Sequence, residues 1–252
     1  MIILVSPAKS LDFDSPLPAV TASTPRFAEQ SATLVRSAAR LSKARLKQIM
    51  PVSDALVDLN YGRFRSFFDQ PERPAAFAFN GDVYTGLQAR TLEPAALNYA
   101  QDHLRILSGL YGLLRPLDAM RPYRLEMGTR WAPRHTSLVR FWGDRIAAAI
   151  ADDLAACGGD TVINLASQEY FAAAEKGLVK RGIRVVTADF RQDGPDGPRF
   201  ISFDAKRARG MAARYLCEHR FADPEALKGF DSDGYHFVPD KSDDTIWRFV
   251  RA

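Results

Sequence analysis

The chain opens with MIILVSPAK, residues 1–9, in which four apolar residues, Ile2–Val5, run directly into Ser6 and Pro7. Three of the four are β-branched, and a short continuous apolar run of this kind is typical of a strand buried on both faces of a sheet. The proline ends the run because it lacks a backbone N–H for the sheet. We therefore predict a central strand over Ile2–Val5.

Similar short runs recur along the chain, at Ala76–Phe79, Leu104–Leu107, Thr161–Leu165, Arg184–Ala188 and Phe200–Phe203. Helical patterns lie between them, at about 24–41, 93–102, 137–156, 168–176 and 204–219. This alternation predicts a mixed α/β fold, with one domain over residues 1–252, a central sheet and flanking helices. Two C-terminal runs, Tyr235–Val238 and Ile246–Val250, are expected to form an antiparallel edge hairpin. The segment Gln192–Pro198 is expected to be a turn.

Composition sets broad limits on function. With 252 residues, 46% of them hydrophobic and 25% charged, the chain is long enough to bury a substantial core. Its 34 Lys and Arg against 30 Asp and Glu give a net charge of +4, which permits a nucleic-acid partner without requiring one. Its 2 cysteines form no CxxC motif, which argues against a disulfide framework or structural zinc. We expect a cytoplasmic protein with no membrane partner, metal or cofactor.

Small or polar residues follow each expected strand. They are Ser6-Pro7-Ala8-Lys9, Asn80-Gly81-Asp82, Ser108-Gly109, Asn164-Leu165-Ala166-Ser167 and Ser202-Phe203-Asp204-Ala205-Lys206. In α/β sheets, ligands bind beyond the carboxyl ends of the strands, where the loops converge. Strands also end in turn residues for structural reasons. The lysines and the Asn-Gly-Asp exceed what a turn requires, so we predict a ligand site at these strand ends.

The helix expected from Asp204 begins with three cations, Lys206, Arg207 and Arg209. Cations near a helix N-terminus oppose the helix dipole, and a bound phosphate would compensate for them. The structural alternative is a solvated helix end capped by Asp204, because surface charges contribute little to stability.

Residues 42–66 predict two short helices joined by the sequence Met-Pro-Val-Ser. A helix–hairpin–helix element binds the nucleic-acid backbone through such a connection. The glycines usual in that hairpin are missing here, and Asp54 would repel a phosphate. A purely structural helical hairpin is therefore an open alternative.

Enzymatic motifs are scarce. There is no Walker loop, no GxGxxG after a strand, and no histidine with a second ligand at metal-binding spacing. General acids and bases are available at the strand ends and in the segment 106–128, which we expect to be an ordered, irregular loop; they are Asp82, Tyr84, Tyr111, Glu126, Glu169 and Lys206. For Glu126, a structural ion pair with Arg124 is the alternative.

Seven blocks of sequence, in order, resemble the peroxide stress protein YaaA family. They are SPAKSLDF (6–13), FNGDVYTGL (79–87), LRILSGLYGLLRPLDAMRPYRLEMG (104–128), FWGD (141–144), VINLASQEYF (162–171), SFDAKRARGMAARY (202–215) and FDSDGYHF (230–237). The resemblance implies a cytoplasmic bacterial protein that limits free iron and oxidative DNA damage during hydrogen peroxide stress. It also implies an unusual mixed α/β fold that binds DNA through a basic cleft and a helix–hairpin–helix element.

The resemblance, together with the strand-end pattern, indicates the candidate site residues. The candidates for binding DNA phosphates are Lys9, Arg115, Arg124, Lys206, Arg207 and Arg209. The residues expected to line the cleft are Ser6, Asn80, Asp82, Tyr84, Ser108, Tyr111, Glu126, Asn164 and Ser167. No catalytic role attaches to any of them. The expected partner is duplex or distorted DNA, contacted mainly through its backbone. The alternatives are an enzyme acting on a nucleotide, a nucleobase or a damaged base in DNA, and an interaction protein without chemistry.

Overall fold

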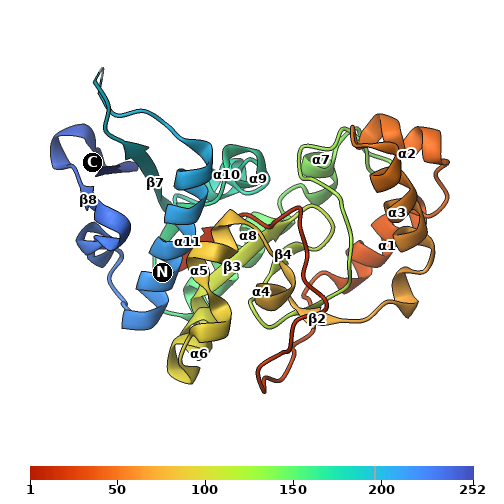
Figure 1. Ribbon diagram of the computed structural model, residues 1–252, viewed down its shortest axis with the longest axis horizontal. Coiled ribbons are helices and arrows are strands. Elements are labelled where there is room, and N and C mark those ends of the chain that lie inside the picture. The colour runs from red at the N-terminus through yellow and green to blue at the C-terminus, as the bar shows by residue number, and fades with distance from the viewer. Residues whose placement is uncertain (196) are drawn as a thin grey trace.

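Strand β1, Ile2–Val5, lies in the middle of a seven-stranded sheet and is completely buried, as predicted. The computed structural model describes residues 1–195 and 197–252 (Figure 1). The strands, in the spatial order β4-β3-β1-β6-β7-β9-β8, are Gly112–Leu114, Leu104–Ser108, Ile2–Val5, Thr161–Leu165, Arg184–Gln192, Ile246–Arg251 and Tyr235–Phe237. The five inner strands run parallel, while β4 and β8 are antiparallel edges. The predicted C-terminal hairpin is thus confirmed at the β8 edge.

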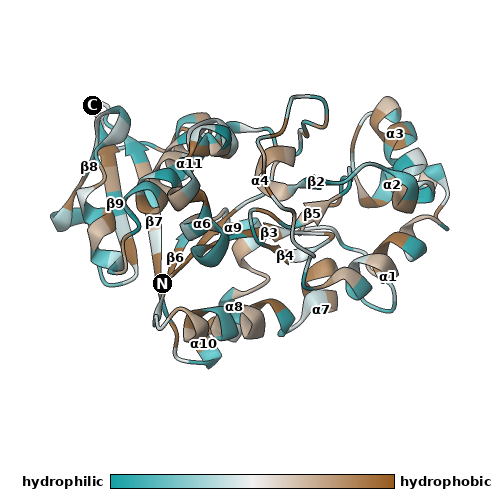
Figure 2. Ribbon diagram, turned by 90° about the horizontal axis from the view of Figure 1, so that it is seen from below, coloured by the Kyte–Doolittle hydropathy of each residue, from teal (hydrophilic) through white to brown (hydrophobic). Residues whose placement is uncertain are grey.

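Helices cover both faces of this sheet and gather at one end of the molecule. They are α1 Ala28–Ala38, α2 Lys43–Ile49, α3 Asp54–Arg65, α4 Ala75–Ala78, α5 Asp82–Leu87, α6 Pro94–His103, α7 Leu138–Trp142, α8 Arg145–Ala156, α9 Gln168–Phe171, α10 Glu175–Lys180 and α11 Ser202–His219. Helix α11 crosses one face, α8 and α10 cover the other, and α1–α3 gather at the end of the molecule remote from β8 (Figures 1 and 2). A separate ribbon pairs β2, Arg73–Pro74, with β5, Ala119–Met120. None of the described helices is both long and apolar enough to span a bilayer.

Two of the predicted strands are wrong. Ala76–Phe79 falls mostly in helix α4, and all four residues of that helix are buried. A short buried apolar run has the same appearance in a strand and in a buried helical turn, so its periodicity could not separate them. The second, Phe200–Phe203, overlaps the start of α11 at Ser202, and both phenylalanines are exposed to solvent.

The predicted helix over 137–156 is interrupted. Gly143, with φ of 53°, separates α7 from α8, because a left-handed residue cannot continue a right-handed helix. The pattern at 168–176 likewise gives two short helices, α9 and α10. The segment 106–128 is only partly irregular, since it contains the end of β3, all of β4 and the short β5.

Helices α5 and α11 approach each other closely enough for their backbones to touch. A Cβ atom on Gly210 would lie 1.8 Å from the carbonyl oxygen of Val83, and one on Gly86 would lie 2.1 Å from that of Arg207. Only glycine allows this distance. The contact fixes the start of α5, which carries Asp82, beside Lys206 of α11.

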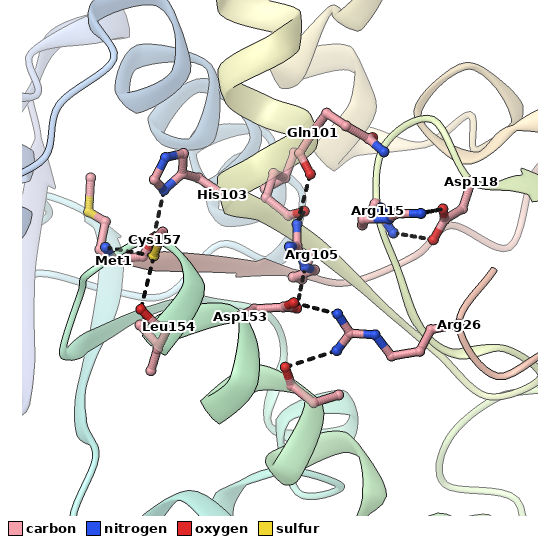
Figure 3. Close-up of polar contacts among 12 residues, drawn as sticks. Met1, Arg26, Gln101, His103, Arg105, Arg115, Asp118, Asp153, Leu154 and Cys157 are labelled. Carbon is pink, nitrogen blue, oxygen red and sulfur yellow. Dashed lines mark hydrogen bonds and ion pairs between the residues drawn. The ribbon is translucent and has the colours of Figure 1, made fainter. Parts of the chain in front are cut away.

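A buried ion-pair network joins the sheet to the helical layer (Figure 3). The Nε of Arg105 on β3 lies 2.7 Å from Oδ2 of Asp153 on α8, and the side chains of these residues are 5% and 8% exposed. Arg26, which precedes α1, binds the other oxygen of the same carboxylate. Burial raises the pKa of Asp153, but hydrogen bonds and charge from the two guanidinium groups outweigh it and lower the pKa overall.

The buried apolar residues form one continuous cluster. It extends from Phe249 on β9, through Ile3 on β1, to Leu34 on α1 and Phe64 on α3. The helical end is therefore packed onto the same core as the sheet. That residues 1–252 unfold as one cooperative unit stays a prediction.

Candidate functional site

A cavity of about 410 Å³ lies beyond the carboxyl ends of the neighbouring strands β1 and β6. After β1 the chain next enters this sheet at β3, on one side of β1, whereas after β6 it enters at β7, on the opposite side. The two loops therefore leave the sheet in opposite directions and open a crevice between them. This is the topological switch point at which open α/β sheets bind ligands.

Hydroxyl groups from the two loops meet on the wall of this cavity. Ser6 Oγ accepts a hydrogen bond from the Ser167 backbone N–H at 2.8 Å and donates one to Ser167 Oγ at 3.3 Å. Behind them, the Tyr84 hydroxyl donates to the Ser6 carbonyl oxygen at 3.1 Å. Asn164 holds the turn after β6, because its Oδ1 accepts from the Ala166 N–H at 3.0 Å. The Ser6–Ser167 hydrogen bonds thus hold the loop after β1 against the loop after β6.

Helix α11 and the start of α5 supply the charges of one wall. Lys206 Nζ lies 3.7 Å from Oδ2 of Asp82. One turn further along α11, Arg209 also faces the cavity, and its Nε is buried with no hydrogen-bond partner among residues 1–195 and 197–252. Burial lowers the pKa of the Arg209 guanidinium, and the negative charge of nearby Asp189 acts in the opposite direction. A buried guanidinium N–H without an acceptor is unfavourable. The Arg209 side chain as a whole is only partly buried, so its guanidinium can bind an anion in the cavity.

The opposite wall carries two glutamates. Glu126 Oε1 lies 3.3 Å from Lys9 Nζ and 3.1 Å from Arg124 Nη2, so two cations share it. Glu169 Oε1 accepts a hydrogen bond from the Gly128 N–H at 2.9 Å. Arg124 has a buried Nε for which the described residues offer no acceptor. The cavity lining therefore balances Lys9, Lys206 and Arg209 against Asp82, Glu126 and Glu169.

One tyrosine, Tyr170, lines the cavity, and two buried tyrosines, Tyr84 and Tyr123, lie behind the loop after β1. Burial raises the pKa of Tyr84 and Tyr170, and the charges of Glu169 and Glu126 raise that of Tyr170 further. Tyr123 also has a raised pKa, chiefly through burial, although its hydroxyl bonds Ser108 Oγ at 2.6 Å. These phenols stay protonated at neutral pH. They are not available as bases, and only Tyr170 offers aromatic surface to the cavity.

The structure brings many of the predicted site residues together. Those lining the cavity are Ser6, Lys9, Asn80, Asp82, Glu126, Ser167, Lys206 and Arg209. Three others contact residues of the cavity wall: Tyr84 bonds Ser6, Asn164 bonds the turn before Ser167, and Arg124 pairs with Glu126. Ser108 and Tyr111 are buried beside Tyr123 and do not line the cavity.

Two predicted phosphate ligands lie elsewhere. Arg115 forms an ion pair with buried Asp118 at 3.0 Å (Figure 3), and Arg207 points toward Asp233 at 3.9 Å. Tyr170 and Ser10 line the cavity but were not predicted. Tyr170 could have been found from its position, since it follows the strand-end Ser167 by three residues.

The expected position of the cations on α11 needs a correction. The helix begins at Ser202, so its first turn contains Asp204, while Lys206 and Arg209 lie further along. Because the helix dipole acts mainly within the first turn, it neither opposes these cations nor explains them. What relates them to an anion is the cavity that they face.

Helices α2 and α3 form the predicted pair of short helices around residues 50–53. Two cations of α2 are paired with acids of α3, since Lys43 Nζ lies 2.8 Å from Asp58 Oδ1 and Lys47 Nζ lies 2.5 Å from Asp54 Oδ1. A shallow groove beside α2, lined by Arg45 and Arg130, meets the main cavity at Glu126 and Glu169. Across the described residues, no three His, Cys, Asp or Glu side chains are grouped to hold a metal ion.

Comparison of the sequence with known proteins relates the chain to one family. A family model described as peroxide stress protein YaaA matches residues 1–241. A UPF0246 protein from Rhizorhabdus wittichii is 56% identical over 253 residues, covering 100% of both chains. UPF0246 proteins from Caulobacter vibrioides and Ralstonia nicotianae are 47% and 48% identical, over 100% of this chain and 99% of theirs. The match spans every element that builds the cavity, and the chain belongs to the peroxide stress protein YaaA family.

Proposed function

We propose that this protein binds DNA in the cytoplasm during hydrogen peroxide stress, mainly through the phosphate backbone, and so limits oxidative DNA damage and intracellular free iron. The observation that supports binding is Arg209, which lines a cavity that also contains Lys206 and has no ion-pair partner among residues 1–195 and 197–252. Guanidinium groups bind phosphate with two parallel hydrogen bonds, so a phosphate oxygen is a suitable acceptor.

The surroundings of Arg209 favour an anion that arrives from outside the chain. No carboxylate of the described residues lies within ion-pair distance of its guanidinium, although Asp189 on β7 is near enough to influence its pKa. That carboxylate already pairs with Arg191 at 2.9 Å and Arg248 at 2.8 Å. Arg209 is partly buried, and a charge that loses hydration without gaining a close partner is unfavourable, a cost that an incoming phosphate would offset.

Salt titrations test this proposal. Fluorescence anisotropy with a labelled duplex should show an affinity that falls as salt rises, because cations that bind phosphates release counterions. Lys206→Gln should make the slope of log K against log salt shallower, by roughly 0.9 if one phosphate contact is lost. The matched control is Lys180→Gln, at the exposed end of α10 on the other face of the sheet, which should leave the slope unchanged. Binding that does not change with salt would refute the proposal.

The effect on iron requires a cellular measurement. A strain lacking the protein should contain more chelatable iron after peroxide exposure, as measured by whole-cell electron paramagnetic resonance. The wild-type chain should reverse this, and Lys206→Gln should reverse it less well at equal protein level. Equal iron in the presence and absence of the protein would contradict this part of the proposal.

A second candidate function is an enzyme that acts on a nucleotide, a nucleobase or a damaged base in DNA. Three carboxylates, Asp82, Glu126 and Glu169, line the same cavity as the cations, and such groups serve as general acids and bases. Mass spectrometry of nucleotides and oxidised oligonucleotides after incubation would reveal a product. Activity that survives in both Glu126→Gln and Glu169→Gln would argue against these carboxylates.

A further inference from the structure

The charges that line the cavity do not all find partners within the described chain. Lys206 pairs with Asp82, and Lys9 pairs with Glu126. Arg209 and Glu169 remain, and neither has an oppositely charged group within 4 Å among residues 1–195 and 197–252. One cavity therefore holds one cation and one anion that the rest of the molecule leaves unmatched.

Arg209 and Glu169 bind different groups of a ligand. Arg209 offers N–H donors only, so it binds an anionic oxygen. Glu169 offers acceptors only, and Gly128 N–H already uses its Oε1, so Oε2 is available to a donor. Inorganic phosphate would satisfy Arg209 alone. A ligand that carries both a phosphate and an N–H donor would satisfy both residues.

Nucleotides combine these two groups. The amino groups of cytosine, adenine and guanine donate hydrogen bonds, and a glutamate is a recognised acceptor for the cytosine amino group. Thymine presents a carbonyl oxygen at the corresponding position. A carboxylate on the wall of the cavity therefore favours cytosine over thymine, two bases of nearly equal size.

The dimensions of the cavity limit how much of a nucleic acid can enter. At about 410 Å³ it falls within the usual range for small-molecule sites, roughly 300–1,000 Å³. A double helix cannot enter its interior, although a backbone phosphate of a duplex can reach the exposed Lys206. Enzymes and binding proteins that read a single base of a duplex extrude it into such a pocket. Tyr170, on the cavity wall, provides aromatic surface of the kind on which bases stack.

We infer that the cavity binds one nucleoside monophosphate unit, with its phosphate on Arg209 and the amino group of its base on Glu169. The inference rests on the proposed function and narrows its ligand to a nucleotide that is not base-paired. The same unit can come from a free mononucleotide or from an unpaired position in DNA, and the two sources require separate measurements.

Isothermal titration calorimetry with mononucleotides tests the site itself. dCMP should bind at least about tenfold more tightly than dTMP, because the correct base meets the acceptor, and more tightly than deoxycytidine or inorganic phosphate, each of which lacks one of the two groups. Glu169→Gln should abolish the preference for dCMP. This variant keeps an oxygen to accept from Gly128, and Glu169 is exposed, so folding should be unaffected. The control Arg207→Gln, outside the cavity on the same helix, should retain the preference.

DNA substrates then separate the two sources. A duplex with a single bulged dC should bind more tightly than the fully paired duplex if the unit is supplied by DNA, and dCMP should compete for the bulged duplex. If only the mononucleotide binds, a free nucleotide is the ligand. Equal binding of dCMP and dTMP, or a preference that survives in Glu169→Gln, overturns the inference even if duplex DNA still binds with a normal salt dependence. Loss of duplex binding alone would instead contradict the proposed DNA-binding function.

Discussion

Replacing Gly210 with alanine should test whether the contact between α5 and α11 is as close as the structure shows. In a helix interior, alanine is intrinsically better than glycine by about 0.5–1 kcal/mol. Considered only as a helical residue, Gly210→Ala should therefore stabilise the protein. The structure predicts the opposite, because the added Cβ atom would lie 1.8 Å from Val83 O and 2.8 Å from Leu87 N.

The size of the effect follows from what has to move. The atoms in the way belong to the backbone of α5, so no side-chain rotation can relieve the overlap, and the two helices must separate. Overpacking in a core typically costs about 1–3 kcal/mol, and a forced backbone shift lies at the upper end of that range. After the propensity gain, we expect a net destabilisation of about 2 kcal/mol. For a chain of this length, that lowers the melting temperature by roughly 4–8 °C.

Gly62 provides the matched control. It lies inside α3, it is exposed, and a Cβ atom on it would have no neighbour within 4 Å. Gly62→Ala should therefore raise the unfolding free energy by about 0.5–1 kcal/mol. Denaturant titrations of the two variants should give opposite signs. If Gly210→Ala is as stable as the wild type or more stable, the close approach of α5 and α11 is wrong, and with it the placement of Asp82 beside Lys206.

Three further predictions concern the buried Asp153 ion pair, the two thiols and the cooperativity of the fold. Asp153→Asn should lower the unfolding free energy by about 3–5 kcal/mol, because Arg105 stays buried without its charge partner. The pKa of Asp153 in the folded state lies below its ordinary value of 3.8. The stability that ionised Asp153 contributes is therefore fully present above pH 3.8 and should be lost as the pH falls through the lowered pKa. Urea titrations between pH 7 and pH 2.5 would show this loss. Burial raises the pKa of the Cys217 thiol to about 12, so mass spectrometry after brief alkylation at pH 8 should find the half-buried Cys157 modified and Cys217 intact. Limited proteolysis should give few stable fragments, and two pieces cut near residue 72 or 195 that each fold alone would contradict a single cooperative unit.

Strands of the sheet were predictable where a short apolar run was also rich in β-branched residues. Ile2–Val5 and Thr161–Leu165 are short, rich in β-branched residues and followed by polar turns, and both are inner strands. Ala76–Phe79 lacks β-branched residues, and its apolar character reflects a buried helical turn instead. The order of the strands was not predictable, because it depends on which non-local pairings bury the most surface, and no local pattern records them.

The composition of the site was easier to predict than its electrostatics. Ser6, Lys9 and Ser167 were found because they follow the parallel strands β1 and β6, whose carboxyl ends share one edge of the sheet. Asn80, Asp82, Lys206 and Arg209 also line the cavity, but they follow Ala76–Phe79 and Phe200–Phe203, which are not strands, so the strand-end argument does not explain them. The sequence gives no sign that Arg209 and Arg207, two positions apart on one helix, differ in environment. The difference arises from the rotation of α11, which directs Arg209 into the cavity and Arg207 toward Asp233.

That rotation is itself a result of the glycine contact. Gly210 must face Val83 for α5 and α11 to touch, and on a helix with 3.6 residues per turn this choice determines the direction of every other side chain. Lys206 and Arg209, three residues apart, then share the face that lines the cavity, and Arg207 does not. Gly210, which has no side chain, therefore determines where the guanidinium of Arg209 lies, and that guanidinium has no ion-pair partner within the described chain. For this reason a variant at Gly210 that still folds should weaken nucleotide and DNA binding through Arg209, although Gly210 does not line the cavity.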